Sequence, residues 1–83
     1  ASPLQSLALM NNPFVLHQSQ STSERLQREH SVLEDQIRQL LELAYQRPPR
    51  DTELGALKAY ATEHGLAALC RIVFNSNEFL FIP

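Results

Sequence analysis

The sequence has one cysteine, two glycines and no stretch in which apolar and polar residues alternate. Such alternation is the pattern that predicts a half-buried β-strand, so the chain gives almost no support for β structure. Cys70 cannot form a disulfide within the chain, and no Cys-x-x-Cys-His motif is present to attach a haem. The sequence therefore predicts an all-α protein.

The chain also has no surplus of positive charge and no long apolar run. Seven Lys and Arg face nine Asp and Glu, which gives a net charge of -2, so no overall field attracts the phosphates of nucleic acid. The apolar runs are far shorter than the ~20 residues that cross a bilayer. We therefore expect neither nucleic-acid binding nor a membrane span.

The length of 83 residues fits one small helical domain, residues 1–83. The chain does not open with a positively charged segment followed by the apolar run of a signal peptide. Its first residues already have the spacing of a helix. We therefore expect a C-terminal fragment of a larger multidomain protein.

Two helices are expected in the first third of the chain, over residues 3–11 and 13–30. Asn12 can accept a hydrogen bond as N-cap, and Pro13 suits the first helical position. Residues 18–23 are mostly Ser, Thr and Gln, whose side chains compete for backbone hydrogen bonds. They predict fraying or a kink near Ser21, and a flexible polar linker is the alternative.

Three more helices are expected after residue 30. Ser31 and Glu34 have the spacing of a capping box for the third, whose end is set by Pro48. Asp51 or Thr52 is expected to cap the fourth, and Gly65 to stop it in a left-handed conformation. The fifth runs from Leu66 to about residue 75 and is apolar nearly all round, which is typical of a central helix.

These elements predict a compact bundle of four to five short helices. Its expected core consists of the apolar residues on the inward faces: Leu33, Ile37, Leu40, Leu41, Leu57, Leu66, Leu69, Cys70, Val73 and Phe79.

No residue is predicted to be catalytic, to bind a cofactor or to ligate a metal. Cys70 lies on the apolar side of its helix, so we interpret it as a small buried hydrophobe. His30 and Glu34 have the spacing of two metal ligands, but a new helix is expected to begin between them and no further ligand lies nearby. Residues 47–50, Arg-Pro-Pro-Arg, favour a stiff corner over a polyproline ligand.

The polar residues 75–78 are the candidate interface, because they lie between an apolar helix and an aromatic tail. Polar side chains are costly to bury unless they are hydrogen-bonded. They can end the helix, or they can hold an adjoining domain or ligand. The residues considered for this interface are Asn75, Asn77, Glu78, Phe79 and Phe81.

Three blocks carry a resemblance to a known family. Residues 7–15 are similar to its Asn-x-Pro-Phe-Val block, residues 43–49 to its Leu-Gly-Arg-Pro-Pro block, and residues 67–80 to the block near its end. The chain thereby resembles the end of the cytochrome-associated Planctomycetes domain of unknown function number 1553. It departs from the pattern at Gln46, where the family usually carries glycine, and at Pro83, where members often end with an acidic residue.

The resemblance implies an exported or periplasmic parent protein that carries a cytochrome c-like haem module and a second uncharacterised domain upstream. Haem c is then expected elsewhere in the parent and not in this fragment. The expected function is a non-catalytic helical C-terminal module that docks onto the upstream domains or onto another protein. The alternative is a structural part of an enzyme active site, carbohydrate-related or redox, whose reactive groups lie upstream.

Overall fold

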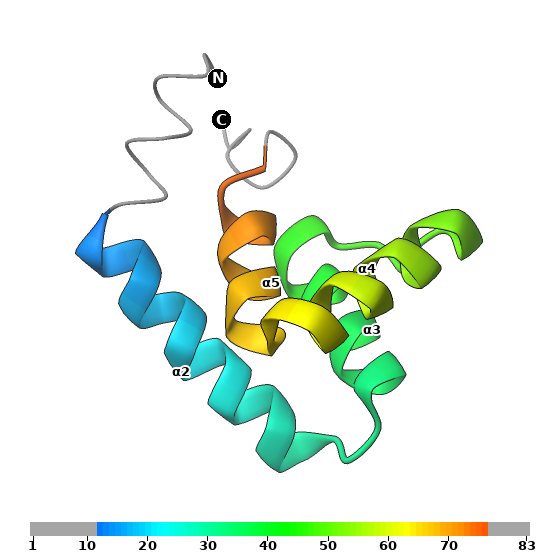
Figure 1. Cartoon of the computed structure of the whole chain (residues 1–83), viewed down its shortest axis with the longest axis horizontal. Coiled ribbons are helices and arrows are strands. Elements are labelled where there is room, and N and C mark those ends of the chain that lie inside the picture. Colours follow the sequence, from blue (N-terminus) through cyan, green and yellow to red (C-terminus); the bar gives the residue numbers. More distant parts are fainter. Residues whose placement is uncertain (1–11, 77–83) are drawn as a thin grey trace.

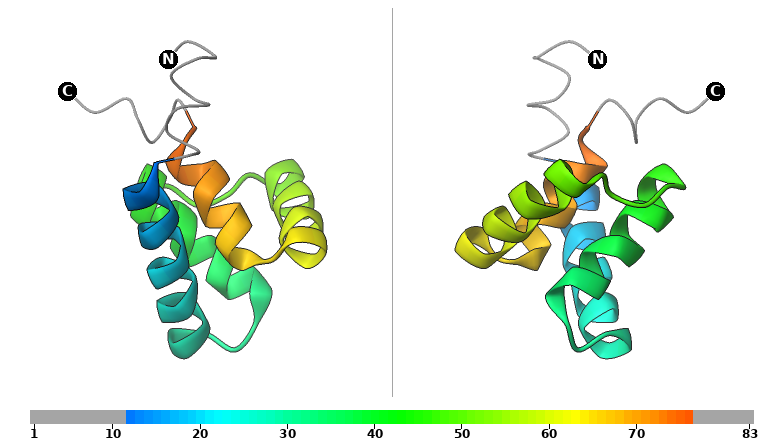
Figure 2. Two further views of the ribbon diagram at one scale, coloured as in Figure 1. Left: turned by 60° about the vertical axis from the view of Figure 1, so that its left-hand side comes forward. Right: turned by 90° about the vertical axis from the view of Figure 1, so that its right-hand side faces the viewer.

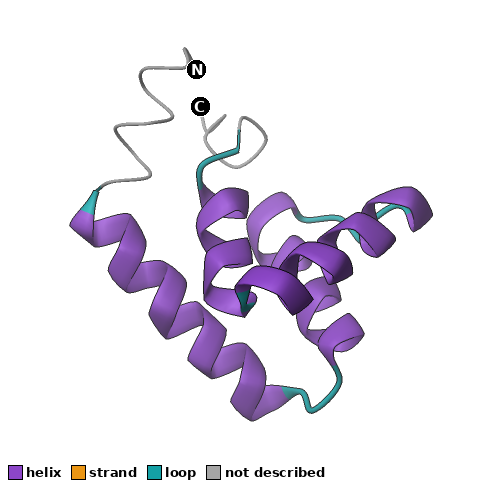
Figure 3. Cartoon of the chain, in the orientation of Figure 1, coloured by secondary structure: helices purple, strands orange, loops and turns teal. Residues whose placement is uncertain are grey.

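The structure is a computed structural model that describes residues 12–76, and these residues form four helices (Figures 1 and 3). The bounds are α2 Pro13–Glu29, α3 Leu33–Tyr45, α4 Asp51–His64 and α5 Leu66–Phe74. Residues 12–76 contain no strand, so the predicted all-α class is confirmed. None of these helices is both long and apolar enough to cross a bilayer. The helix expected over residues 3–11 lies outside the described residues.

α2 is continuous through its polar middle. Asn12 Oδ1 accepts a hydrogen bond from the Phe14 amide at 2.8 Å, and Pro13 takes the first helical position, as predicted. The expected fraying or kink near Ser21 is wrong, and so is the linker alternative. The Ser19 hydroxyl donates to the Val15 carbonyl at 2.7 Å, so this side chain is satisfied without interrupting the helix.

α5 is the central helix, as its composition predicts. It contacts all three other helices and runs antiparallel to α2, its largest neighbour (Figures 1 and 2). Ser19 and Ser23 are small and buried on α2, and small residues allow a neighbouring helix to approach closely. The end of α5 therefore lies at the same end of the molecule as the start of α2.

The core agrees with most of the prediction. Ile37, Leu40, Leu41, Leu66, Leu69, Cys70 and Val73 are buried as expected. Leu33 and Leu57, also predicted in the core, are only partly buried and pack against it. Leu26, Ala44 and Ala61 complete the core, and Phe79 lies outside the described residues.

The start of α3 corrects the predicted capping box. Val32 is the N-cap and makes no side-chain capping bond, so Ser31 lies one residue too early to cap the helix. Glu34 turns to other partners, since its carboxylate accepts a hydrogen bond from Arg38 at 2.7 Å and lies 3.6 Å from Lys58. Glu34 therefore joins α3 to α4.

α3 ends at Tyr45, followed by Gln46 in a left-handed conformation with φ 55° and ψ 36°. Glycine adopts this conformation without the steric cost that a Cβ brings. Glycine would therefore suit this position. Gln46 makes the same turn with a side chain, and this turn, ahead of Pro48, ends the helix.

α4 begins one or two positions earlier than expected, depending on which of the two predicted caps is taken. Arg50 is its N-cap, while Asp51 and Thr52 lie inside the helix, so the predicted caps are wrong. Glu53 supplies the capping interaction by accepting the Arg50 amide at 2.9 Å. At the other end Gly65 stops the helix as predicted, but with φ 95° and ψ 155°. This backbone is extended and not left-handed helical, and essentially only glycine adopts it.

The two glycines of the chain are expected to respond to alanine with opposite signs. Gly65→Ala should lower the free energy of unfolding by about 1–3 kcal/mol, because a Cβ disfavours this backbone even though it meets no atom within 4 Å. Gly55→Ala, inside α4 and exposed, should raise it by about 0.5–1 kcal/mol through helix propensity. Denaturant unfolding measures both, and equal effects of the two substitutions would contradict the assignment of strain to Gly65.

Candidate functional site

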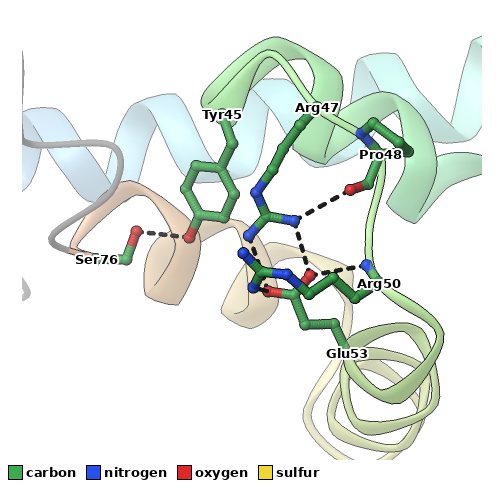
Figure 4. A network of polar contacts seen from close by, with 6 residues as sticks. All are labelled: Tyr45, Arg47, Pro48, Arg50, Glu53 and Ser76. Carbon is green, nitrogen blue, oxygen red and sulfur yellow. Dashed lines mark hydrogen bonds and ion pairs between the residues drawn. The ribbon is translucent and has the colours of Figure 1, made fainter.

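Arg47 and Glu53 form a bidentate ion pair that closes the corner between α3 and α4 (Figure 4). The two terminal nitrogens of Arg47 lie 2.8 and 2.9 Å from the two carboxylate oxygens of Glu53. Arg47 also donates to the Pro48 carbonyl at 3.0 Å. Because Arg47 is engaged in the fold and Pro49 is buried, the prediction that residues 47–50 form a corner between two helices is confirmed.

Tyr45 connects this corner to the end of α5. The Arg47 guanidinium carbon lies 5.3 Å from the centroid of the Tyr45 ring, a cation–π contact. The Tyr45 hydroxyl lies 2.5 Å from Ser76 Oγ, and Ser76 Oγ donates to the Val73 carbonyl at 2.7 Å. Since the serine proton points to Val73, Tyr45 is the donor to Ser76. The corner and the C-terminal turn of α5 are thereby held together (Figure 4).

Glu53, Glu34 and Cys70, all in the part of the chain that the structure describes, have shifted pKa values, and each shift has a structural cause. The hydrogen bonds from Arg47 and then from the Arg50 amide lower the pKa of Glu53 to about 2. The hydrogen bond from Arg38, with the nearby Lys58 charge, lowers the pKa of Glu34. Burial raises the pKa of the Cys70 thiol to about 12. All three shifts move away from neutrality, so these carboxylates stay ionised and this thiol stays protonated.

Cys70 has the role that the sequence indicates, whereas Glu34 takes part in ion pairs. Cys70 is fully buried among apolar neighbours, which confirms a small hydrophobe and leaves no reactive thiolate. Glu34 is paired with Arg38 and Lys58. Within residues 12–76 no group of three side chains is arranged to hold a metal ion.

Asn75 is the one predicted interface residue that the structure describes. Its Nδ2 donates to the Arg71 carbonyl at 2.7 Å, and its side chain is almost fully buried. A carbonyl can only accept, so this bond fixes which amide atom is the oxygen. That oxygen, Oδ1, is buried and has no hydrogen-bond partner, a state that costs about 1–3 kcal/mol. Asn77, Glu78, Phe79 and Phe81 lie outside the described residues.

The start of α2 carries two exposed apolar side chains that the sequence reasoning missed. Phe14 is 68% exposed and Leu16 is 41% exposed. The spacing predicts the exposure of Phe14, because at 100° per residue it lies far from the buried face formed by Ser19, Ser23 and Leu26. It does not predict the exposure of Leu16, which is seven residues from Ser23 and so lies on nearly the same side of the helix. The start of α2 and the end of α5, where Asn75 is the C-cap, lie at the same end of the molecule (Figure 2).

The ion pair predicts a pH dependence of stability. The pKa of Glu53 is depressed from 4.5 to about 2 in the folded protein, so its contribution is present above pH 4.5 and is lost as the pH falls through about 2. Glu53→Gln should lower the free energy of unfolding by about 1–2 kcal/mol at neutral pH, allowing for solvent screening of a partly exposed pair. The difference from the unmodified chain should vanish in strong acid, as denaturant titrations at several pH values can show.

Glu63→Gln is the matched control for Glu53→Gln, because its side chain is 77% exposed on the same helix. It should change stability by less than about 0.5 kcal/mol. A Glu53→Gln effect that stayed constant down to strong acid would contradict the ionic origin of the stabilisation.

Cys70 is expected to be inert in the folded chain. A thiol-specific reagent should label it only as fast as the protein opens, because the thiol is buried and its pKa is raised to about 12. Cys70→Ser should lower the free energy of unfolding by about 1–3 kcal/mol, since a hydroxyl must then leave water. Labelling kinetics in native buffer and in denaturant test this, and equal rates in both would show that the thiol is accessible.

Comparison with known proteins gives a family and no activity. The model of the family PSD1, described as protein of unknown function (DUF1553), matches residues 1–61. No curated protein matches the chain, and no solved structure matches it either. The matched segment holds the first two of the three resembling blocks and ends within α4, while residues 67–80 lie beyond it. The chain therefore belongs to the PSD1 (DUF1553) family of proteins of unknown function.

Proposed function

We propose that the chain is a non-catalytic helical module that docks onto the upstream part of a larger protein through the end where α2 begins and α5 ends. The observation that carries the proposal is the 68% exposure of Phe14, a large aromatic side chain that the described fold does not bury. Aromatic residues of this kind are enriched at the centres of interfaces.

The position of Phe14 supports an occupant from the same protein. Phe14 lies in the first turn of α2, so the chain that leads into the fold at Asn12 passes close to Phe14. A tethered partner has an effective concentration on the order of millimolar. Even a small apolar contact is then occupied for much of the time.

Asn75 supports the same end of the molecule. Its Oδ1 is buried and unpaired, so a rearrangement on docking that gives it a donor would recover free energy that the isolated fold lacks. Asn77, Glu78, Phe79 and Phe81 come shortly after Asn75 in the sequence and remain part of this proposed interface.

The proposal includes an exported parent protein that carries haem c in another domain. This part of the proposal rests on the family resemblance.

The experiment is a titration of the labelled chain with the separately produced upstream part of its parent protein, followed by chemical shifts. We expect saturable binding, with the largest shifts at Phe14, Leu16 and Asn75. Phe14→Ala should weaken binding by about 30-fold, the effect of an interface anchor, and should leave the melting temperature nearly unchanged.

Val32→Ala is the matched control, because Val32 is 53% exposed and lies beyond the opposite end of α2. It should bind like the unmodified chain. Unchanged affinity of the Phe14→Ala variant for the upstream part would contradict docking through Phe14. Binding of a small saccharide or a redox partner at this end, with no binding of the upstream part, would favour the active-site alternative.

A further inference from the structure

The first half of α2 presents a helix surface without charge. Residues 1–23 contain no Asp, Glu, Lys or Arg, so every charged residue of the chain, with histidine counted as neutral, lies in residues 24–83. The second half of α2 is different, because Arg25 and Glu29 form an exposed ion pair at 3.1 Å. The outward surface of this one helix therefore changes from uncharged to charged at Glu24.

Four exposed residues of the first half lie on one side of the helix: Phe14, His17, Gln18 and Ser21. Their spacing is i, i+3, i+4 and i+7, which groups side chains on one helical face. At about 100° per residue, this face lies on the side of α2 opposite the buried residues that pack against α5. We call these four residues the uncharged face.

The described fold gives the uncharged face little stabilisation of its own. Exposed helix faces are commonly stabilised by charged pairs four residues apart, as Glu34 and Arg38 form on α3 at 2.7 Å. The first half of α2 has no charged residue for such a pair, and its first turn has no acidic residue to interact with the helix dipole. Contact with another domain explains a polar helix face that lacks such pairs.

The side chains of the uncharged face define the chemistry of the surface that fits it. Charged residues are depleted at the centres of interfaces, because an unpaired charge is costly to bury. The Gln18 amide and the Ser21 hydroxyl can each donate and accept a hydrogen bond, and Phe14 supplies apolar area. The matching surface is therefore uncharged, with an apolar patch for Phe14 and amide, hydroxyl or backbone groups beside it.

The sequence before α2 indicates the side from which this surface comes. Residues 1–11, which lead into α2, are as free of charge as the first half of the helix itself. The uncharged face begins at Phe14, in the first turn after this segment. It is thus continuous with the part of the chain that connects to the upstream domains.

We propose that the docking site at Phe14 extends along α2 over the whole uncharged face, and that it takes an uncharged surface of the upstream part of the parent protein. The contact is made by apolar packing and by neutral hydrogen bonds, with no ion pair. This inference rests on the docking function proposed above, and it adds His17, Gln18 and Ser21 to the site and names the chemistry of the partner surface.

The test places one charge on the uncharged face without changing its shape. Gln18→Glu keeps the size of the side chain, and Gln18→Lys adds the opposite charge. Each variant should bind the separately produced upstream part at least about tenfold more weakly, because a charge must then be buried without a partner. Both should keep the melting temperature of the unmodified chain, since Gln18 is exposed and all three residues are good helix formers.

Gln27→Glu is the matched control, because it makes the same isosteric change at an exposed position of the second half of α2. It should bind within about twofold of the unmodified chain, as expected for a residue outside the interface. The affinity of the unmodified chain should also change by less than about twofold between about 0.05 and 0.5 M salt, because salt screens charged contacts.

The outcomes separate this inference from the docking function on which it rests. Weaker binding of Phe14→Ala together with unchanged binding of both Gln18 variants would leave docking at Phe14 in place and overturn the extended uncharged face. Tighter binding of either Gln18 variant would show a charged partner surface and would also overturn it. No binding of the unmodified chain would overturn both proposals.

Discussion

The fold depends on the burial of α5. This helix of nine residues is apolar on nearly every side, and Leu66, Leu69, Cys70 and Val73 are all buried. Such a helix needs neighbours around it, because one face of packing would leave the rest in water. α2 makes the most extensive contact with α5, and α3 and α4 also pack against it. The family match ends at residue 61, so the helix that completes the core lies beyond the matched segment.

The sequence predicts the elements whose signal is hydrophobic spacing. The stripe of Ile37, Leu40 and Leu41 identifies α3 and its buried face, and the apolar run after Gly65 identifies α5 as central. It fails where local polar chemistry competes with helix formation. The polar residues 18–23 predicted fraying or a kink near Ser21, yet the Ser19 hydroxyl bonds the Val15 carbonyl and its small size suits contact with α5. α2 is continuous because of tertiary packing, which the local sequence does not predict.

The polar corner was less predictable than the core. Arg47 and Glu53 are separated by two prolines and a turn, so their spacing does not match that of side chains that pair along one helix. Their ion pair is seen only in the folded structure. The contact of Tyr45 with Ser76 joins residues 31 positions apart. Asn75 was selected from the sequence as costly to bury, and the structure supplies the reason, an unpaired buried oxygen.

The two blocks inside the matched segment differ in how much of them the fold explains. Asn12 and Pro13 start α2, and Arg47 and Pro49 build the corner, so these residues have structural roles that need no ligand. Phe14 is different, because its side chain stays 68% exposed, whereas the neighbouring residues Asn12 and Pro13 have structural roles. A large exposed aromatic group gains free energy only when another surface covers it. The case for an interface therefore depends on this one side chain more than on any charged group of the chain.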